Sequence, residues 1–191
     1  HTADHDIVES ADLLRKKYCS VVGSLSYAVL STRPDIAHAV NQLSRFLVAP
    51  LPHHWKAAKH VLQYLRGTAD LGLVFRGGDA IELDLGPAYS DADWGGDLDD
   101  RKSTTGFVVK INGCAVVWRS KKQTSVARSS AEAEYIALGD MLKEVVWLRQ
   151  LFTELGIPLK PTTLFCDNKA AISISENYVS NNATKHIDIA Y

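Results

Sequence analysis

Three acidic clusters in this chain have residue types and an order that could hold a metal ion. They lie at residues 89–94, 130–135 and 164–168, and each places a carboxylate where the apolar pattern predicts the edge of a folded core. Bringing three carboxylates together is unfavourable unless a cation binds them. Hard divalent ions such as Mg²⁺ prefer oxygen-rich sites of this kind. The order strand, helix, strand indicates a fold that could gather the three clusters.

In the first cluster we expect Asp91 at the end of a strand, with Asp93 two residues further and therefore on the same face. A solvated turn or a calcium loop is the alternative, because Asp91, Asp93, Asp97 and Asp99 echo an EF-hand spacing. Lys102 stands where the bidentate glutamate of such a loop belongs, and a strand precedes the segment instead of a helix. The sequence therefore disfavours calcium.

The second cluster offers two glutamates, which helix geometry separates. Steps of four and three residues from Glu134 meet only apolar positions, namely Leu138, Met141, Val145, Leu148 and Phe152. The same steps from Glu132 meet a mixed face, and Ser129 three residues before it matches a capping box. Glu134 is therefore predicted at the edge of the core face, where a carboxylate is unfavourable unless it is paired or metal-bound.

In the third cluster Asp167 ends an apolar strand and comes just before a helix. That place suits a metal ligand, and it equally suits a helix N-cap, which aspartate fills well. The other two clusters favour the metal-binding role.

The elements that must position these residues begin with a helical subdomain, predicted over residues 1–70. Apolar residues recur there at helical spacings, with breaks at Pro34 and Pro50 and a stop at Gly67. From Leu71 the apolar residues alternate instead, which predicts strands joined by turns at 77–78 and 112–113.

A long helix over 130–155, a strand over 162–166 and a helix over 168–175 complete the predicted pattern. Residues 71–191 are thus expected to form an α/β domain with three antiparallel strands, helix, strand and helix.

The bulk composition is that of an ordinary globular chain of 191 residues, with 46% hydrophobic and 23% charged residues. The net charge of −1 gives no bulk attraction to nucleic acid, so such binding would need local basic patches. Arg119, Lys121, Lys122 and Arg128 are the candidates, since together they could neutralise phosphates. Each by itself is more typical of solvated surface.

Other features of the sequence concern its compartment. The cysteines, at positions 19, 114 and 166, are expected to be core residues of a reduced intracellular protein, not a disulfide or zinc framework. No apolar run reaches the roughly 18 residues of a bilayer span, and no secretory signal is visible. The chain begins at His1, which indicates a processed product or a piece of a longer reading frame.

The motifs of the second half resemble the ribonuclease H domain of copia-type (Pseudoviridae-like) retrotransposon Pol polyproteins. The matching segments are Tyr89-Ser90-Asp91-Ala92-Asp93-Trp94, Arg101-Lys102-Ser103-Thr104-Thr105-Gly106, Trp118-Arg119-Ser120-Lys121-Lys122-Gln123, Ser129-Ser130-Ala131-Glu132-Ala133-Glu134-Tyr135, Cys166-Asp167-Asn168-Lys169-Ala170-Ala171 and Lys185-His186-Ile187-Asp188-Ile189. The first half resembles the segment that joins reverse transcriptase to that domain. Its matching segments are Gly23-Ser24-Leu25-Ser26-Tyr27, Arg33-Pro34-Asp35-Ile36 and Tyr64-Leu65-Arg66-Gly67-Thr68.

The resemblance implies a ribonuclease H-like mixed sheet and a hydrolase that cuts the RNA strand of RNA–DNA hybrids during reverse transcription. The family uses two Mg²⁺ or Mn²⁺ ions held by four acidic residues. Asp91 would bridge the ions, Glu134 and Asp167 would flank them, and Asp93 would stay nearby. The implied partners are the hybrid, read by shape with little base specificity, and the reverse transcriptase part of the same polyprotein, with no membrane. The implied location is the cytoplasm, within virus-like particles, or the nucleus.

The fourth acidic residue of the family lies on a final helix that follows another strand. The chain stops at Tyr191, and Asp188 is not that ligand by position, so we expect a domain without its last strand and helix. The alternative function is a truncated, non-catalytic remnant that at most binds nucleic acid or a partner. An integrase-like polynucleotidyl transferase shares the fold but not the glutamate on the first helix of the domain, here the helix over 130–155 that carries Glu134.

Overall fold

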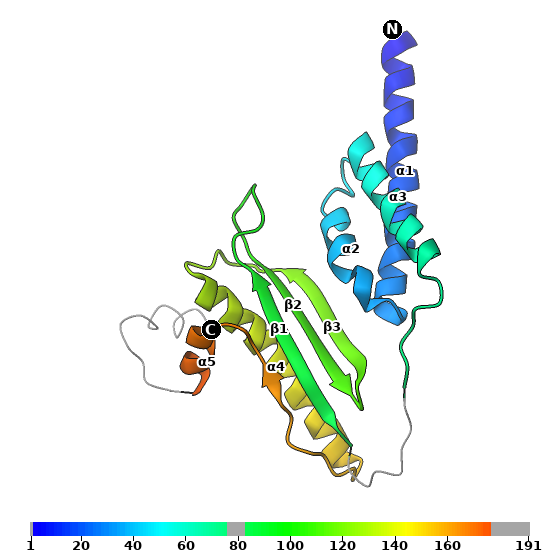
Figure 1. Cartoon of the computed structure of the whole chain (residues 1–191). Coiled ribbons are helices and arrows are strands. Elements are labelled where there is room, and N and C mark those ends of the chain that lie inside the picture. The colour runs from blue at the N-terminus through cyan, green and yellow to red at the C-terminus, as the bar shows by residue number, and fades with distance from the viewer. Residues whose placement is uncertain (1, 76–82, 177–191) are drawn as a thin grey trace. The chain divides into compact units, whose positions relative to one another are not determined.

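The computed structural model describes residues 2–75 and 83–176, and the chain divides into two compact units, His1–Leu73 and Val74–Tyr191 (Figure 1). The boundary lies close to the predicted one at residue 70. None of the helices in the described ranges is long and apolar enough to cross a membrane.

The first unit is helical, as its apolar spacing predicts. Its elements are α1 (Thr2–Ser31), the 3-10 helix η1 (Pro34–Ile36), α2 (Ala37–Ser44) and α3 (Pro52–Gly67). The buried core that joins them consists of Tyr18, Val22, Leu25, Ile36, Val40, Leu43, Ala58 and Val61. The Tyr18 hydroxyl is buried within this core and donates a hydrogen bond to the Leu43 carbonyl at 2.7 Å.

Arg33, which follows the end of α1, also binds Thr68 at the C-terminal end of α3. The guanidinium of Arg33, of which only 8% is exposed, donates to both carboxylate oxygens of Asp35. It also donates to the Thr68 carbonyl at 3.1 Å and to the Thr68 hydroxyl at 2.7 Å. A buried arginine needs such partners for its charge and its five donors.

The second unit contains the mixed sheet that the sequence predicts. Its elements are β1 (Leu85–Asp93), β2 (Thr104–Ile111), β3 (Cys114–Lys122), α4 (Ser130–Glu154), β4 (Leu164–Phe165) and α5 (Lys169–Glu176). The strand order is β3-β2-β1-β4, with the first three antiparallel and β4 parallel to β1. This is the ribonuclease H-like arrangement. The turn between β2 and β3 has positive φ at Asn112 (48°) and Gly113 (81°), as a two-residue hairpin turn requires.

Helix α4 runs along one face of this sheet (Figure 1). Its predicted apolar stripe packs there, and the buried core comprises Leu85, Ala88, Phe107, Val109, Leu138, Met141, Val145 and Leu148. Glu134 begins that stripe, so the helix that covers the sheet also carries one of the predicted site residues.

Some of the predicted strands differ from the structure. Residues 71–75 form no strand despite their alternation, because an isolated alternating segment has no ladder to join, and Leu71, Val74 and Phe75 are more than half exposed. The predicted strand over 162–166 is reduced to Leu164–Phe165. The turn predicted at 77–78 and the motif around His186 and Asp188 lie outside the described residues.

Candidate metal centre

The parallel pairing of β1 with β4 brings two of the predicted carboxylates to one place. Ala88 pairs with Leu164 and Tyr89 with Phe165, and the rings of Tyr89 and Phe165 stack with their centroids 5.1 Å apart. Asp91 and Asp167 each follow two residues later. Since side chains alternate along extended chain, this register puts both aspartates on one face, Asp91 within β1 and Asp167 just beyond β4.

Glu134 reaches this place from α4. Its side chain is buried, with 5% of the residue exposed, and the Ala92 backbone N–H donates to its Oε1 at 3.1 Å. Ala92 lies one residue after Asp91 in β1, so the hydrogen bond ties the helix carboxylate to the strand that carries Asp91.

The surroundings make the charged form of Glu134 unfavourable. Burial raises the pKa of Glu134 to about 7. The Ala92 amide opposes this rise, whereas the nearby charges of Asp91 and Asp167 add to it. Within residues 2–75 and 83–176, no lysine or arginine forms an ion pair with any of the three carboxylates.

The third carboxylate, Asp167, lies against Glu134 together with a thiol. A carboxylate oxygen of each acid and the Cys166 sulfur all lie within 4.8 Å of one another. The Cys166 thiol points at Glu134 Oε2, at an Sγ–Oε2 distance of 4.0 Å. Both oxygens of Glu134 therefore have a neighbour, the Ala92 amide on one side and the thiol on the other.

The alternative in which Asp167 caps the following helix is wrong, because the neighbouring Asn168 is the N-cap. Asn168 Oδ1 accepts hydrogen bonds from the Ala170 and Ala171 amides, both at 3.0 Å, at the start of α5. Asp167 precedes this cap and remains exposed beside Glu134.

The capping role predicted for Glu132 is confirmed in a modified form. Ser129 is the N-cap of α4, and its hydroxyl accepts from the Glu132 amide at 3.1 Å. The Glu132 carboxylate reaches back one residue further than expected and accepts from the Arg128 amide at 2.7 Å. Glu132 thus serves the helix end, and Glu134 serves the carboxylate cluster.

The donors of this cluster fit a hard divalent cation. Asp91, Glu134 and Asp167 together supply carboxylate oxygens, the ligands that Mg²⁺ and Mn²⁺ prefer. A bound cation would also favour the charged form of buried Glu134, which the protein itself leaves unfavourable.

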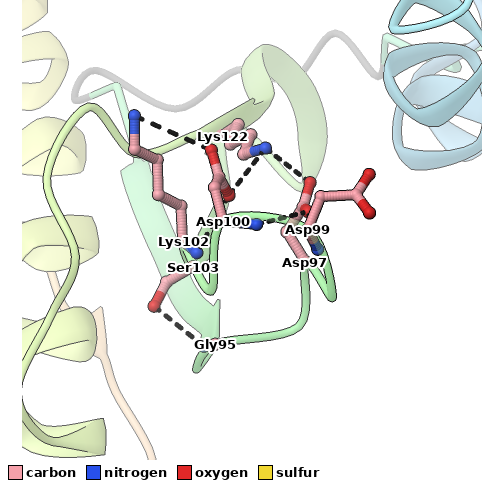
Figure 2. A network of polar contacts seen from close by, with 7 residues as sticks. All are labelled: Gly95, Asp97, Asp99, Asp100, Lys102, Ser103 and Lys122. Carbon is pink, nitrogen blue, oxygen red and sulfur yellow. Dashed lines mark hydrogen bonds and ion pairs between the residues drawn. The ribbon is translucent and has the colours of Figure 1, made fainter.

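The loop between β1 and β2 contains a second acidic cluster, in which a lysine ammonium, and not a metal ion, binds the carboxylates (Figure 2). The ammonium of Lys122, at the end of β3, pairs with Asp97 at 2.5 Å and with Asp100 at 2.8 Å. Asp97 Oδ1 also accepts from the Asp99 amide at 2.9 Å. This arrangement disfavours the EF-hand alternative further, because the Lys122 ammonium already binds Asp97, one of its four candidate ligands.

The hydrogen bond from Lys122, with those from the Asp99 and Asp100 amides, lowers the pKa of Asp97 to about 2. The same lysine lowers the pKa of Asp100, and the two carboxylates raise the pKa of Lys122. Asp93, predicted near the site, lies at the base of this loop, where its carboxylate occupies the space that a side chain at Gly96 would need.

The four basic residues predicted to bind nucleic acid have different surroundings. Arg119 pairs with Glu144 of α4 at 3.0 Å, and Lys122 is bound in the loop. Lys121 lines a cavity of about 350 Å³ between the end of β3 and α4, which none of the three site carboxylates lines. Arg128 is exposed just before α4. Their binding of nucleic acid stays a prediction.

One site residue is absent from the sequence-based prediction. Cys166 was expected in the core, yet its thiol lies among the carboxylates. The signal that could have found it is the alternation of side chains. If the register of β1 and β4 continues one residue beyond Phe165, Cys166 stands opposite the buried Ser90, on the face that α4 covers.

Comparison with known proteins identifies relatives over nearly the whole chain. The chain is 46% identical over 185 residues to the retrovirus-related Pol polyprotein from transposon TNT 1-94 of Nicotiana tabacum. This match covers 97% of the chain and 14% of that protein. The chain is 44% identical over 176 residues to the corresponding polyprotein from transposon RE2 of Arabidopsis thaliana, covering 92% of this chain and 12% of that protein. The chain thus spans only a small part of these relatives.

A third relative is short. The secreted RxLR effector protein 161 of Plasmopara viticola is 50% identical over 131 residues, which are 69% of this chain and 90% of that protein. No family model and no solved structure matches the chain.

Proposed function

The chain belongs to the family of copia-type retrotransposon Pol polyproteins, and from this premise we propose that its second unit is a ribonuclease H-type endonuclease domain. Its substrate would be the RNA strand of an RNA–DNA hybrid, and its cofactor Mg²⁺ or Mn²⁺, bound as two ions. The first unit would be the segment that connects this domain to reverse transcriptase.

One observation carries the proposal: a buried glutamate lies against two further acids with no cationic partner among the described residues. Burial and the two neighbouring acids disfavour the charged form of Glu134, at a cost in stability unless a cation is bound. Residues kept in such an unfavourable state are typical of functional sites.

In this proposal the residues of the chain have separate roles. Asp91, Glu134 and Asp167 would hold the metal ions, and the Ala92 amide would orient Glu134. Divalent ions bound there supply an activated water and stabilise the leaving oxygen in phosphodiester hydrolysis. Because protons compete with metal for Glu134, the apparent metal affinity should increase as the pH rises through about 7.

The decisive experiment is cleavage of a labelled RNA–DNA hybrid by the purified chain in Mg²⁺, with Asp91→Asn and Asp99→Asn as a matched pair. We expect Asp91→Asn to abolish cleavage, because it removes a ligand charge. Asp99→Asn should retain cleavage, because the Asp99 side chain is exposed on the loop and only its amide is bound to Asp97. Equal activity of the two variants would contradict the assignment of the site.

A non-catalytic role is the second candidate, and the short effector relative favours it. Nearly all of that protein matches this chain, so a similar stretch occurs without the rest of a polyprotein. A wild-type chain that binds the hybrid but neither cuts it nor binds Mn²⁺ would support this second candidate.

A further inference from the structure

The carboxylate cluster contains a ligand that Mg²⁺ does not need. The sulfur of Cys166 and one carboxylate oxygen each from Glu134 and Asp167 lie within 4.8 Å of one another. Magnesium and manganese prefer oxygen, whereas a thiolate is a ligand of softer ions such as Zn²⁺ and Cd²⁺. The donor set at this end of the sheet is therefore mixed.

The spacing of these three donors is close to that of a zinc site. Zn–S bonds of about 2.3 Å and Zn–O bonds of about 2.1 Å place tetrahedral ligands about 3.5 Å apart. The Sγ–Oε2 distance between Cys166 and Glu134 is 4.0 Å. Small side-chain rotations would bring the donors onto one ion without a change in the backbone.

A buried hydroxyl beside the cysteine gives independent support for a ligand. Ser90 is only 7% exposed, and its Oγ has no hydrogen-bond partner within the described part of the chain. It interacts with the Cys166 thiol, although without the geometry of a full hydrogen bond. A buried hydroxyl without a partner is unfavourable, and an ion, or a water bound to that ion, would satisfy it.

We propose that Glu134, Cys166 and Asp167 form a binding site for a thiophilic divalent cation, Zn²⁺, with the Ser90 hydroxyl beside it. On binding, a Zn–S bond forms as the thiol releases its proton to the buffer, the carboxylates donate oxygen lone pairs, and no oxidation occurs. Since Zn²⁺ would occupy two of the acids proposed for Mg²⁺, it would inhibit hydrolysis. That inhibition rests on the proposed function, but the binding does not.

The test uses Cd²⁺ as a probe of the full chain, because a cadmium–thiolate bond gives a charge-transfer absorption band in the ultraviolet. The matched control is Cys19→Ser, since Cys19 is also half-buried but lies in α1, with its thiol against the Leu47 carbonyl. We expect the band to saturate with one Cd²⁺ in wild type and in Cys19→Ser. It should vanish in Cys166→Ser and in Cys166→Ala, whose melting curves verify folding.

Competition then identifies the biological ion. Zn²⁺ should displace Cd²⁺ and abolish the band, and Glu134→Gln should weaken Cd²⁺ binding at least about tenfold, since a carboxylate ligand is lost. Histidines elsewhere can bind either ion but give no thiolate band. A band that persists in Cys166→Ser, or no band in wild type, would overturn the proposal.

An activity arm separates this inference from the proposed function. If the chain cuts hybrids, Zn²⁺ should inhibit wild type more than Cys166→Ser. If the chain shows no cleavage but keeps the Cys166-dependent band, then the proposed function fails and the zinc site stands.

Discussion

The second unit contains two acidic clusters, in which the repulsion between carboxylates is dealt with in opposite ways. In the β1–β2 loop, Asp97 and Asp100 bind the ammonium of Lys122, and the pKa of Asp97 falls to about 2. At the ends of β1 and β4, Glu134 faces two further acids without a basic partner in the described residues, and its pKa rises to about 7. The count of carboxylates therefore does not mark a metal site. What distinguishes one is the lack of an internal cation.

The largest effect should come from removing the internal cation with Lys122→Met. Asp97 would then lose its ion pair with Lys122, and Asp100 would keep only the longer ion pair with Lys102 at 3.8 Å, so we expect the largest fall in melting temperature of the variants considered. Added Ca²⁺ should restore part of that loss by taking the place of the ammonium.

The control is Lys121→Met, one residue earlier in β3, whose side chain is exposed. Exposed substitutions of this kind usually change stability by no more than about 0.5 kcal/mol. If the two variants melt alike, with and without Ca²⁺, then the lysine is not the cation of the loop.

A smaller effect distinguishes the clusters by pH. Glu134 has a raised pKa, so its contribution to stability is fully present below its usual value of 4.5 and is lost as the pH rises through about 7. Asp97 has a lowered pKa, so its contribution is present above 3.8 and is lost as the pH falls toward 2. The two clusters should therefore destabilise the fold in opposite directions of pH.

Urea unfolding from pH 4.5 to 8 measures the Glu134 part. We expect the free energy of unfolding of wild type to fall by about 2 kcal/mol relative to that of Glu134→Gln over this range. The full shift in the pKa of Glu134 would give a larger fall, but solvent screens the exposed aspartates beside Glu134. Mg²⁺ should diminish the loss, because it stabilises the charged form. A wild-type curve parallel to that of Glu134→Gln would show that Glu134 titrates normally.

The smallest effect concerns the basic residues. Arg119 already pairs with Glu144, whereas Arg128 is exposed and forms no ion pair among residues 2–75 and 83–176. We expect Arg128→Ala to reduce the slope of log K for hybrid binding against log salt concentration by about one unit, the effect of one lost phosphate contact. Arg119→Ala should reduce this slope less. Titrations of hybrid binding at several salt concentrations measure both. A larger effect of Arg119→Ala would place the hybrid over β3 and α4 instead.

Some parts of this site could be predicted from the sequence because they depend on local spacing. The helical period alone separates Glu134 from Glu132, and the structure buries Glu134 at the head of the apolar stripe. The mixed sheet follows from alternation, a hairpin signal and a following helix. These patterns span only a few residues, so the sequence contains them directly.

Other parts depend on contacts between distant residues. Lys122 binds Asp97 across 25 positions of the chain, so no local pattern identifies it as the cation of the loop. The choice between Asp167 and Asn168 as helix cap was also open, because both residue types cap well and they are adjacent. Only the folded backbone shows that Asn168 accepts the helix amides.

The pairing of β4 with β1 has a consequence for how this site could change in evolution. Successive side chains on an extended strand point to opposite faces, so a shift of β4 by one residue would turn Cys166 and Asp167 each to the opposite face. The present alignment is defined by two residue pairs, by the stacked rings of Tyr89 and Phe165, and by the parallel bridge between Leu83 and Leu159. A single insertion or deletion between α4 and β4 could thus alter which metals the site accepts while every ligand residue stays the same.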